Sequence, residues 1–220
     1  MKPRSKKAIV FDFDGTLTDS MEIENLSMSK ALTSVGCFSV SKDEITSHYG
    51  PTERGIISSI VPPGKKEEAW KNCLVYYREL AKDLRPFDGI LDILSSLKEK
   101  SILTLLVTGR SRETLDISLH DMQLEPYFQK TYTGSDSGTN KEESLTSLFK
   151  DFSLDKNEVL YIGDTLDDIR MMRNIQTEIL SAGYSHDKEY QKLLEEKNPG
   201  NVCSSVQQLK TRLMEVIVNH

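Results

Sequence analysis

The chain has 220 residues, and its apolar fraction of 37% and charged fraction of 28% are ordinary for a globular protein with a packed core. Its formal net charge is −6 with both signs interspersed, so no basic face predicts a nucleic-acid partner. No apolar stretch is long enough for a signal peptide or a membrane span, and three cysteines without metal-ligand or redox spacing fit a reducing cytoplasm, so we expect a cytoplasmic protein with no membrane partner.

The first predicted element is a buried strand. Ala8–Phe11 is a short β-branched and aromatic run that ends in polar residues and Gly15. Similar runs predict further strands at 102–107, 130–133 and 158–162. Amphipathic stretches near 112–122 and 142–151 separate these strands, and strands that alternate with helices predict a mainly parallel sheet. We therefore expect an α/β fold with a Rossmann-like core.

The interval between the first two strands is the exception, because it takes nearly ninety residues where a crossover needs about a dozen. Helix-spaced apolar residues occur near 21–35, 42–48, 53–60 and 66–83. Residues 19–22, Asp-Ser-Met-Glu, have the form of a capping box at the start of the first helix. We expect residues 18–84 to form an inserted α-helical cap domain, and residues 1–17 and 85–220 to form the core domain.

The remaining elements complete the core. Residues 85–89 have turn chemistry, and 90–100 predicts the helix that leads into the second strand. Towards the C-terminus we expect a strand at 177–181, a loop with a short helix over 184–200 and a closing helix at 205–218. No heptad seam indicates a coiled coil, and the sequence leaves the oligomeric state open.

Two carboxylates, Asp12 and Asp14, follow the first strand with a spacing that lets both side chains emerge on one side of the chain. The carboxyl ends of strands are where open parallel sheets bind ligands. One carboxylate can attack phosphorus to form an acyl phosphate, while the other gives and takes the proton. The alternative is that the two aspartates only cap a turn before the helix.

A second acidic group, Asp164, Asp167 and Asp168, follows the strand at 158–162. Three acids within five residues repel one another unless a cation holds them, and clustered oxygen ligands suit magnesium. The alternative is that acids in a first helical turn favour the helix dipole.

Two more segments can meet a phosphate group. Thr108 and Gly109 follow the second strand, where a hydroxyl and free amides at a helix N-terminus form a phosphate site, although such a pair also suits a plain turn. Lys141 follows the loop 134–140, and its ammonium can offset the charge of phosphate and carboxylates. Most lysines are solvated, so periodicity alone does not select this one.

In chain order, these pieces resemble the four-motif signature of the haloacid dehalogenase-like superfamily. The matching residues are Asp12-Phe13-Asp14-Gly15-Thr16, then Thr108, then Lys141, then Gly163-Asp164 with Asp168 four residues on. An insertion directly after the first motif is similar to the helical cap of the phosphoglycolate phosphatase and β-phosphoglucomutase branch. The resemblance covers nearly the whole chain.

The resemblance implies a role for each motif residue. Asp12 is the expected nucleophile and Asp14 the acid and base. Thr108 and Lys141 are expected to bind phosphate. Mg²⁺ is expected on Asp12, Asp164 and the backbone carbonyl of Asp14, with Asp168 orienting or completing the metal shell, and Asp167 is assigned to the helix start.

Two arginines are candidate substrate-binding residues. Arg54 lies in the distinctive cap stretch 49–55, which we expect to face the active site, although a solvated charge on a turn explains it equally well. Arg110 stands where relatives often have a small or amide residue, and it offers an extra phosphate or substrate contact.

The predicted function is a magnesium-dependent phosphatase that hydrolyses a small phosphorylated metabolite, phosphoglycolate-like, through an aspartyl-phosphate. A phosphosugar mutase, an inorganic pyrophosphatase and an inactive binding protein with the same fold stay open as alternatives. A haloacid dehalogenase is disfavoured, because that chemistry needs no magnesium and this chain carries both Asp14 and the Asp164 cluster.

Overall fold

The computed structural model describes residues 6–138 and 141–217, and within these ranges six strands form one sheet with ten α-helices. The strands are β1 Ala8–Phe11, β2 Leu103–Val107, β3 Lys130–Tyr132, β4 Val159–Gly163, β5 Glu178–Ala182 and β6 Val202–Cys203. The helices are α1 Met21–Ser34, α2 Lys42–Ser47, α3 Glu53–Ile60, α4 Lys66–Leu80, α5 Ile90–Glu99, α6 Arg112–Asp121, α7 Lys141–Asp151, α8 Leu166–Ile175, α9 Lys188–Lys197 and α10 Val206–Ile217.

All the strand pairs are parallel, in the order β3-β2-β1-β4-β5-β6, which confirms the predicted α/β fold. β1 lies at the centre, where Phe11 pairs with Leu106 of β2 and with Ile162 of β4. The carboxyl ends of these three strands are therefore level, and the loops that follow them meet at one edge of the sheet.

Helices cover both faces of the sheet. Alternation along β1 sends Ile9 and Phe11 into one apolar cluster with α5, α6 and α10, and Ala8 and Val10 into another with α7, α8 and α9. A central parallel strand must be apolar on both faces, and all four β1 residues are fully buried.

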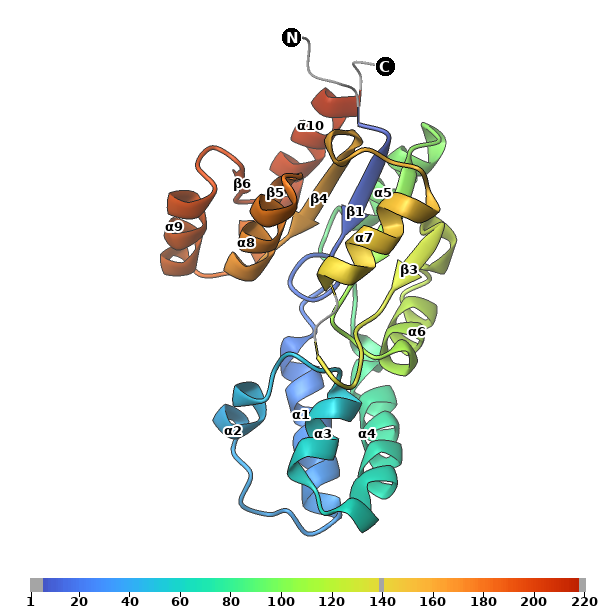
Figure 1. Cartoon of the computed structure of the whole chain (residues 1–220), viewed down its shortest axis with the longest axis vertical. Helices are drawn as coiled ribbons and strands as arrows, with labels where there is room; N and C mark the ends of the chain where they lie inside the picture. Colours follow the sequence, from blue (N-terminus) through green and yellow to red (C-terminus); the bar gives the residue numbers. More distant parts are fainter. Residues whose placement is uncertain (1–5, 139–140, 218–220) are drawn as a thin grey trace.

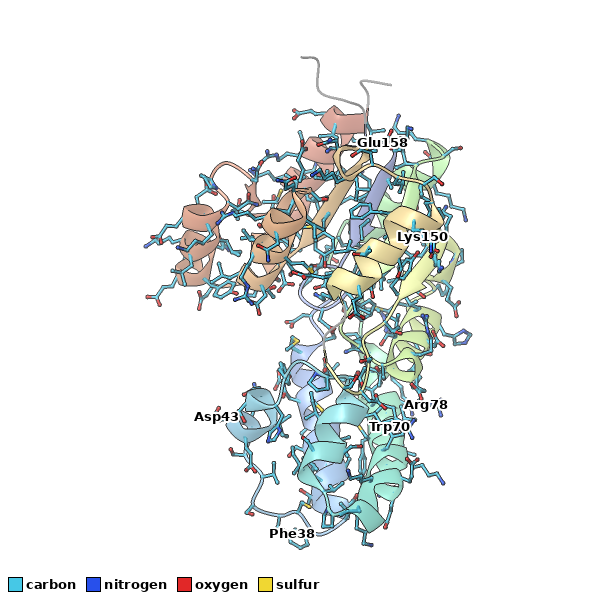
Figure 2. The ribbon with its side chains drawn as sticks, in the orientation of Figure 1. Phe38, Asp43, Trp70, Arg78, Lys150 and Glu158 are labelled. Atoms are coloured by element: carbon cyan, nitrogen blue, oxygen red, sulfur yellow. The ribbon has the colours of Figure 1, made fainter. Side chains whose placement is uncertain are left out.

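The helices α1 to α4 lie together at the end of the molecule opposite the two termini (Figure 1). They share a separate apolar cluster that includes Met28, Leu32, Ile57 and Trp70. Phe38, 79% exposed, lies at the far end of this helical group from the sheet (Figure 2). The structure thus has helices throughout the predicted cap interval, and we use the word cap for helices α1 to α4 and the segments between them. The domain boundaries themselves stay a prediction.

The predicted capping box at the start of α1 is wrong. Ser20 is the N-cap residue, but its side chain makes no capping hydrogen bond. Its hydroxyl instead donates to the carboxylate of Asp14. Donation to a carboxylate leaves a hydroxyl oxygen free to accept a backbone N–H, so this contact alone does not prevent capping. Ser20 has φ −111° and ψ −10° instead of the extended backbone typical of a capping residue.

The C-terminal region contains more regular structure than predicted. The short helix predicted within 184–200 is α9, which has ten residues and carries Tyr190, Leu193 and Leu194 at helical spacing. The edge strand β6 has two residues, too few for an alternation signal, and is held by the pairing of Ser181 with Val202. Thr139 and Asn140, and the chain ends within the predicted core domain, lie outside the described residues.

In the described part of the chain, no helix combines the length and apolar content needed to cross a bilayer.

Candidate active site

Asp12 directly follows β1, a central strand, at the carboxyl end of the sheet. Its N–H continues the sheet pairing by donating to the carbonyl of Ile162 at 2.8 Å. The carboxylate is buried, with Oδ1 accepting the N–H of Phe13 at 2.7 Å and Oδ2 accepting from Lys141 Nζ at 2.6 Å. Both carboxylate oxygens are thereby held in place at the end of the strand.

The turn after Asp14 brings the loops of β1 and β4 into contact. Gly15 has φ +68°, and a Cβ at this position would come within 2.2 Å of Asp164 Oδ2. Only glycine provides both the left-handed backbone and the missing side chain. The structure therefore brings the predicted Asp12–Asp14 pair and Asp164 into one site.

The loop after β4 begins helix α8 with a reciprocal cap. Thr165 is the N-cap residue, accepts the N–H of Asp168 at 3.1 Å and donates to Asp168 Oδ2 through its own N–H at 3.1 Å and its hydroxyl at 2.6 Å. Asp168 Oδ1 accepts from Lys141 at 3.1 Å and from the Tyr161 hydroxyl at 3.2 Å. Asp167 points to solvent and pairs with Arg170 at 2.8 Å, which agrees with its predicted place at the helix start.

Asp12, Asp164 and Asp168 are all buried, and each offers a carboxylate oxygen within 4.8 Å of the others. Burial raises the pKa of Asp12 to about 8 despite the opposing charge of Lys141. Burial also raises the pKa of Asp164. For Asp168, burial is opposed by the Lys141 charge together with hydrogen bonds from Thr165 and Lys141, and the net effect is a lowered pKa. These three carboxylates share Lys141, with His186 beside Asp164, and their oxygen-only donor set suits a hard divalent cation.

His186 completes the surroundings of Asp164. Its Nε2 lies 2.8 Å from Asp164 Oδ2 and 3.0 Å from the Asp164 carbonyl oxygen. Burial would lower the pKa of this histidine, but the Asp164 contact outweighs it and the net effect is a raised pKa. Sequence reasoning missed His186 because it lies in a polar segment predicted as a loop with a short helix, where no local pattern marks it.

Thr108 and Gly109 lie at the same edge, after β2. Thr108 is buried, donates its N–H to the Tyr132 carbonyl at 3.0 Å and accepts the N–H of Arg110 at 3.3 Å on its hydroxyl. A Cβ on Gly134 would come within 2.2 Å of the Gly109 carbonyl oxygen, so the loops after β2 and β3 pack backbone to backbone. This close packing fixes the predicted phosphate loop beside the end of β1.

Arg110 is fully buried and extends behind Asp14. Its Nε lies 3.0 Å from both Asp14 carboxylate oxygens, and its Nη2 lies 3.5 Å from Glu24 of α1. Nη1 donates to the Tyr77 hydroxyl of α4, and the guanidinium stacks about 5 Å from the rings of Phe13 and Tyr77. All three guanidinium nitrogens are engaged, so Arg110 joins Asp14 to two cap helices.

Two buried cap carboxyls were missed by sequence reasoning. Glu24 faces Arg110, and burial together with the nearby charge of Asp14 raises its pKa well above the usual range. Glu53, 1% exposed, accepts the N–H of Ser111, the N-cap residue of α6, at 2.8 Å, and the hydroxyl of Thr114 in its first turn. The sequence gives little indication that these glutamates are buried, because a glutamate in the first turn of a helix normally interacts with the helix dipole while staying solvated.

Arg54 lies at the surface where the cap touches the loop 133–138. It pairs with Glu67 of α4 at 2.7 Å and lies 3.8 Å from Asp136, with 37% of its side chain exposed. The same contact includes Thr52, whose N–H donates to the Ser135 carbonyl at 3.0 Å. The structure places Arg54 at the cap–core contact, with no described contact to the carboxylates of the site.

Comparison with known proteins gives a consistent pattern. A family model described as haloacid dehalogenase-like hydrolase matches residues 9–182. Phosphoglycolate phosphatase 1 of Pseudomonas aeruginosa is 24% identical over 198 residues, 84% of this chain and 73% of that protein. Pyrophosphatase PpaX of Bacillus pumilus is 24% identical over 176 residues, 77% of this chain and 79% of that protein.

A solved structure is similar over nearly the whole chain. The crystal structure of a predicted phosphoglycolate phosphatase from Haemophilus somnus matches with a TM-score of 0.77 at 18% identity, covering 94% of this chain and 98% of that one. At this identity the match shows the fold alone.

Proposed function

The chain belongs to the haloacid dehalogenase-like hydrolase family and is a phosphatase, and we propose that it hydrolyses a small phosphate monoester in a magnesium-dependent reaction through an aspartyl-phosphate on Asp12. The observation that carries the proposal is the position of Asp12. Its buried carboxylate lies at the sheet edge within 2.6 Å of Lys141, in a cluster with Asp164 and Asp168. This arrangement supports a nucleophile next to a phosphate-binding cation and a metal site.

We assign the cation site to Asp12, Asp164 and the backbone carbonyl of Asp14, with Asp168 in support. When bound, Mg²⁺ would neutralise the negative charge shared by these carboxylates and the phosphate. The residues fit this role, because three buried carboxylates offer oxygen ligands within 4.8 Å of one another, the donor set that a hard divalent cation prefers.

The chain's own residues then carry the reaction. An oxygen of Asp12 attacks phosphorus, the bond from phosphorus to the leaving oxygen breaks, and Asp14 gives that oxygen its proton. Lys141, the Thr108 hydroxyl and the Gly109 amide stabilise the charge on the other phosphate oxygens. Asp14 next takes a proton from water, which attacks phosphorus, breaks the bond to Asp12 and releases inorganic phosphate.

The test is metal-dependent phosphate release from p-nitrophenyl phosphate by the wild-type chain and by Asp12→Asn. We expect EDTA to abolish release and Asp12→Asn to lower kcat by at least about a thousandfold. Asp167→Asn is the matched control. It makes the same substitution at an exposed aspartate in the first turn of α8, and it should change kcat less than about twofold. Wild-type rates in Asp12→Asn would remove the nucleophile assignment.

Pyrophosphate is the second candidate substrate, because Pyrophosphatase PpaX of Bacillus pumilus is among the similar proteins. It differs from a monoester in its leaving group, which is itself a phosphate and carries negative charge. Phosphate release from pyrophosphate that exceeds release from every monoester would favour this second function.

A further inference from the structure

Asp164 is held differently from the other two carboxylates of the acidic cluster. Lys141 Nζ lies 2.6 Å from Asp12 and 3.1 Å from Asp168, so one ammonium helps to orient both side chains. In the described part of the chain, Asp164 is not among the ion-pair partners of Lys141. The orientation of the Asp164 carboxylate must therefore come from other groups.

Two donors among the described residues lie within hydrogen-bond distance of the Asp164 side chain. The Thr16 hydroxyl lies 3.4 Å from Oδ1, which is long for a hydrogen bond, whereas His186 Nε2 lies 2.8 Å from Oδ2. His186 Nε2 also lies 3.0 Å from the main-chain carbonyl oxygen of Asp164. His186 is therefore the closer donor, and it connects the side chain of Asp164 to the main chain of the same residue.

These two contacts assign the hydrogen of the imidazole to Nε2. A carbonyl oxygen can only accept, so a ring nitrogen 3.0 Å from it must donate an N–H. Sharing this N–H with Asp164 Oδ2 gives a three-centre hydrogen bond, which restricts rotation of the carboxylate about its Cα–Cβ bond. Because Nε2 carries a hydrogen, it offers no lone pair to a cation. His186 therefore acts through Asp164, and its Nε2 is not a metal ligand.

The imidazole is itself held in place by its neighbours. Its ring packs on Tyr190 of α9 with the centroids 4.3 Å apart, and the Tyr190 hydroxyl accepts the N–H of Leu166 in the first turn of α8 at 3.3 Å. Tyr184, in the same loop as His186, donates its hydroxyl to the Thr16 carbonyl at 2.6 Å. The loop between β5 and α9 is thus tied to the segments that follow β1 and β4, which fixes the position of the imidazole beside the acidic cluster.

We propose that His186 is a positioning residue for the cation site: it holds the Asp164 carboxylate in the orientation that binds Mg²⁺ and thereby raises the affinity for this ion. A carboxylate that is already oriented loses less conformational freedom when the ion binds. Hydrogen-bond partners of metal ligands typically contribute about 10-fold to 100-fold in metal affinity. The inference rests on the proposed function, because it takes Asp164 as a ligand of the metal.

The test compares the magnesium affinity of the wild-type chain, His186→Phe and His186→Gln. Phenylalanine keeps a ring that can pack on Tyr190 but has no donor, whereas glutamine places an amide N–H near the position of Nε2. Thermal unfolding at increasing magnesium chloride gives Kd from the rise in Tm above each variant's own metal-free Tm. We expect His186→Phe to raise Kd by about tenfold or more, and His186→Gln to keep Kd within about threefold of the wild-type value.

A second readout separates positioning from a general loss of structure. With p-nitrophenyl phosphate, the magnesium concentration that gives half the maximal rate should rise with Kd in His186→Phe. At saturating magnesium, kcat should fall by no more than about threefold, because the variant keeps every group proposed to contact the phosphate.

Two further variants serve as matched comparisons. His186→Asn has the same amide as glutamine on a side chain one carbon shorter, so it should bind magnesium as weakly as His186→Phe. The asparagine and glutamine variants therefore decide the question if the phenylalanine variant does not fold. His120→Phe makes the same substitution at an exposed histidine that lies beside Glu125, and it should leave Kd unchanged.

The outcomes distinguish this inference from the function on which it rests. A magnesium-induced rise in Tm that is present in the wild-type chain and lost in Asp164→Asn reports the proposed cation site alone. If that rise is present and His186→Phe has the wild-type Kd, only the inference is overturned. An equal loss of affinity in His186→Phe and His186→Gln would also overturn it, because the donor would then not matter. If the wild-type chain shows no rise, the proposed cation site fails and the inference falls with it.

Discussion

Two halves of the site are held by different parts of the chain. The core half consists of Asp12, Lys141, Asp164 and Asp168, and each of these residues lies in a loop after a strand or in the first turn of the next core helix. The cap half consists of Asp14, Arg110, Ser20, Glu24 and Tyr77, and its contacts join the core to α1 and α4. The core half depends on the sheet alone, whereas the cap half exists only while the cap is seated.

We therefore expect the two halves to contribute differently to catalysis and to stability. Substitutions in the core half should damage the chemical step and leave the folded chain largely intact, because a metal site rather than an apolar core is lost. Substitutions in the cap half should damage stability and substrate choice first, because they separate groups that bridge the two parts.

The largest effect is expected from Lys141→Met in the core half. Removing the ammonium that faces Asp12 and the transferred phosphate should lower kcat by about a hundredfold to a thousandfold, the usual loss for one charge-stabilising donor. Lys150→Met on the exposed side of the same helix (Figure 2) should keep kcat within about twofold. Steady-state kinetics with p-nitrophenyl phosphate makes the comparison, and equal rates in the two variants would remove Lys141 from the phosphate site.

In the cap half, Arg110→Met should act mainly on stability. The change strands the buried Glu24 and the partly buried Asp14 without their cation, and breaking a buried ion pair from one side costs about 3 kcal/mol. For a chain of this size that corresponds to a fall in Tm of roughly 6–12 °C. Arg112→Met removes an exposed guanidinium on α6 that contacts Asp116 and donates to Thr131, and it should cost less than about 1 kcal/mol.

Thermal unfolding followed by circular dichroism measures both arginine variants. An unchanged Tm in Arg110→Met would show that the guanidinium does not hold the two parts together. The division of the site into a core half and a cap half would then not rest on the contacts of Arg110.

The two halves also differ in how far the sequence predicts them. Asp12, Lys141, Asp164 and Asp168 follow short strands with clear apolar runs, and a parallel sheet aligns the strand ends, so their meeting follows from the fold class. The bounds of the cap helices were predicted within a few residues for a different reason: the spacing of apolar residues along a helix can be read locally from the sequence.

The cap half could not be predicted in this way. Ser20 has the pattern of a helix cap, and Glu24 and Glu53 have the pattern of exposed helical residues. Their burial depends on where the cap packs against α6 and Arg110, which is a long-range property without a periodic signal. Arg110 was singled out by its position, but its Asp14 contact needed the three-dimensional arrangement.

Magnesium should produce a smaller effect, confined to the core half. A cation that binds only the folded chain stabilises it by about 2.7 kcal/mol at a hundred times its Kd, or roughly 5–10 °C in Tm. Asp164→Asn should lose most of this shift, because it removes a ligand from the acidic cluster, whereas Asp167→Asn should retain it. A shift that survives in Asp164→Asn would place the cation elsewhere.

The smallest effect is expected from Ser20→Ala in the cap half. The serine hydroxyl donates to the Asp14 carboxylate and makes no capping hydrogen bond, so its loss should cost about 1 kcal/mol of stability without fraying α1. Because this hydrogen bond helps to orient the proposed acid and base, kcat should also fall about threefold to tenfold, with KM nearly constant. Ser29→Ala, on the same helix and not fully buried, is the control for both readouts. A loss of stability with an unchanged kcat would mean that Ser20 fastens the cap without positioning Asp14, and the cap half would then contribute to seating and substrate choice but not to proton transfer.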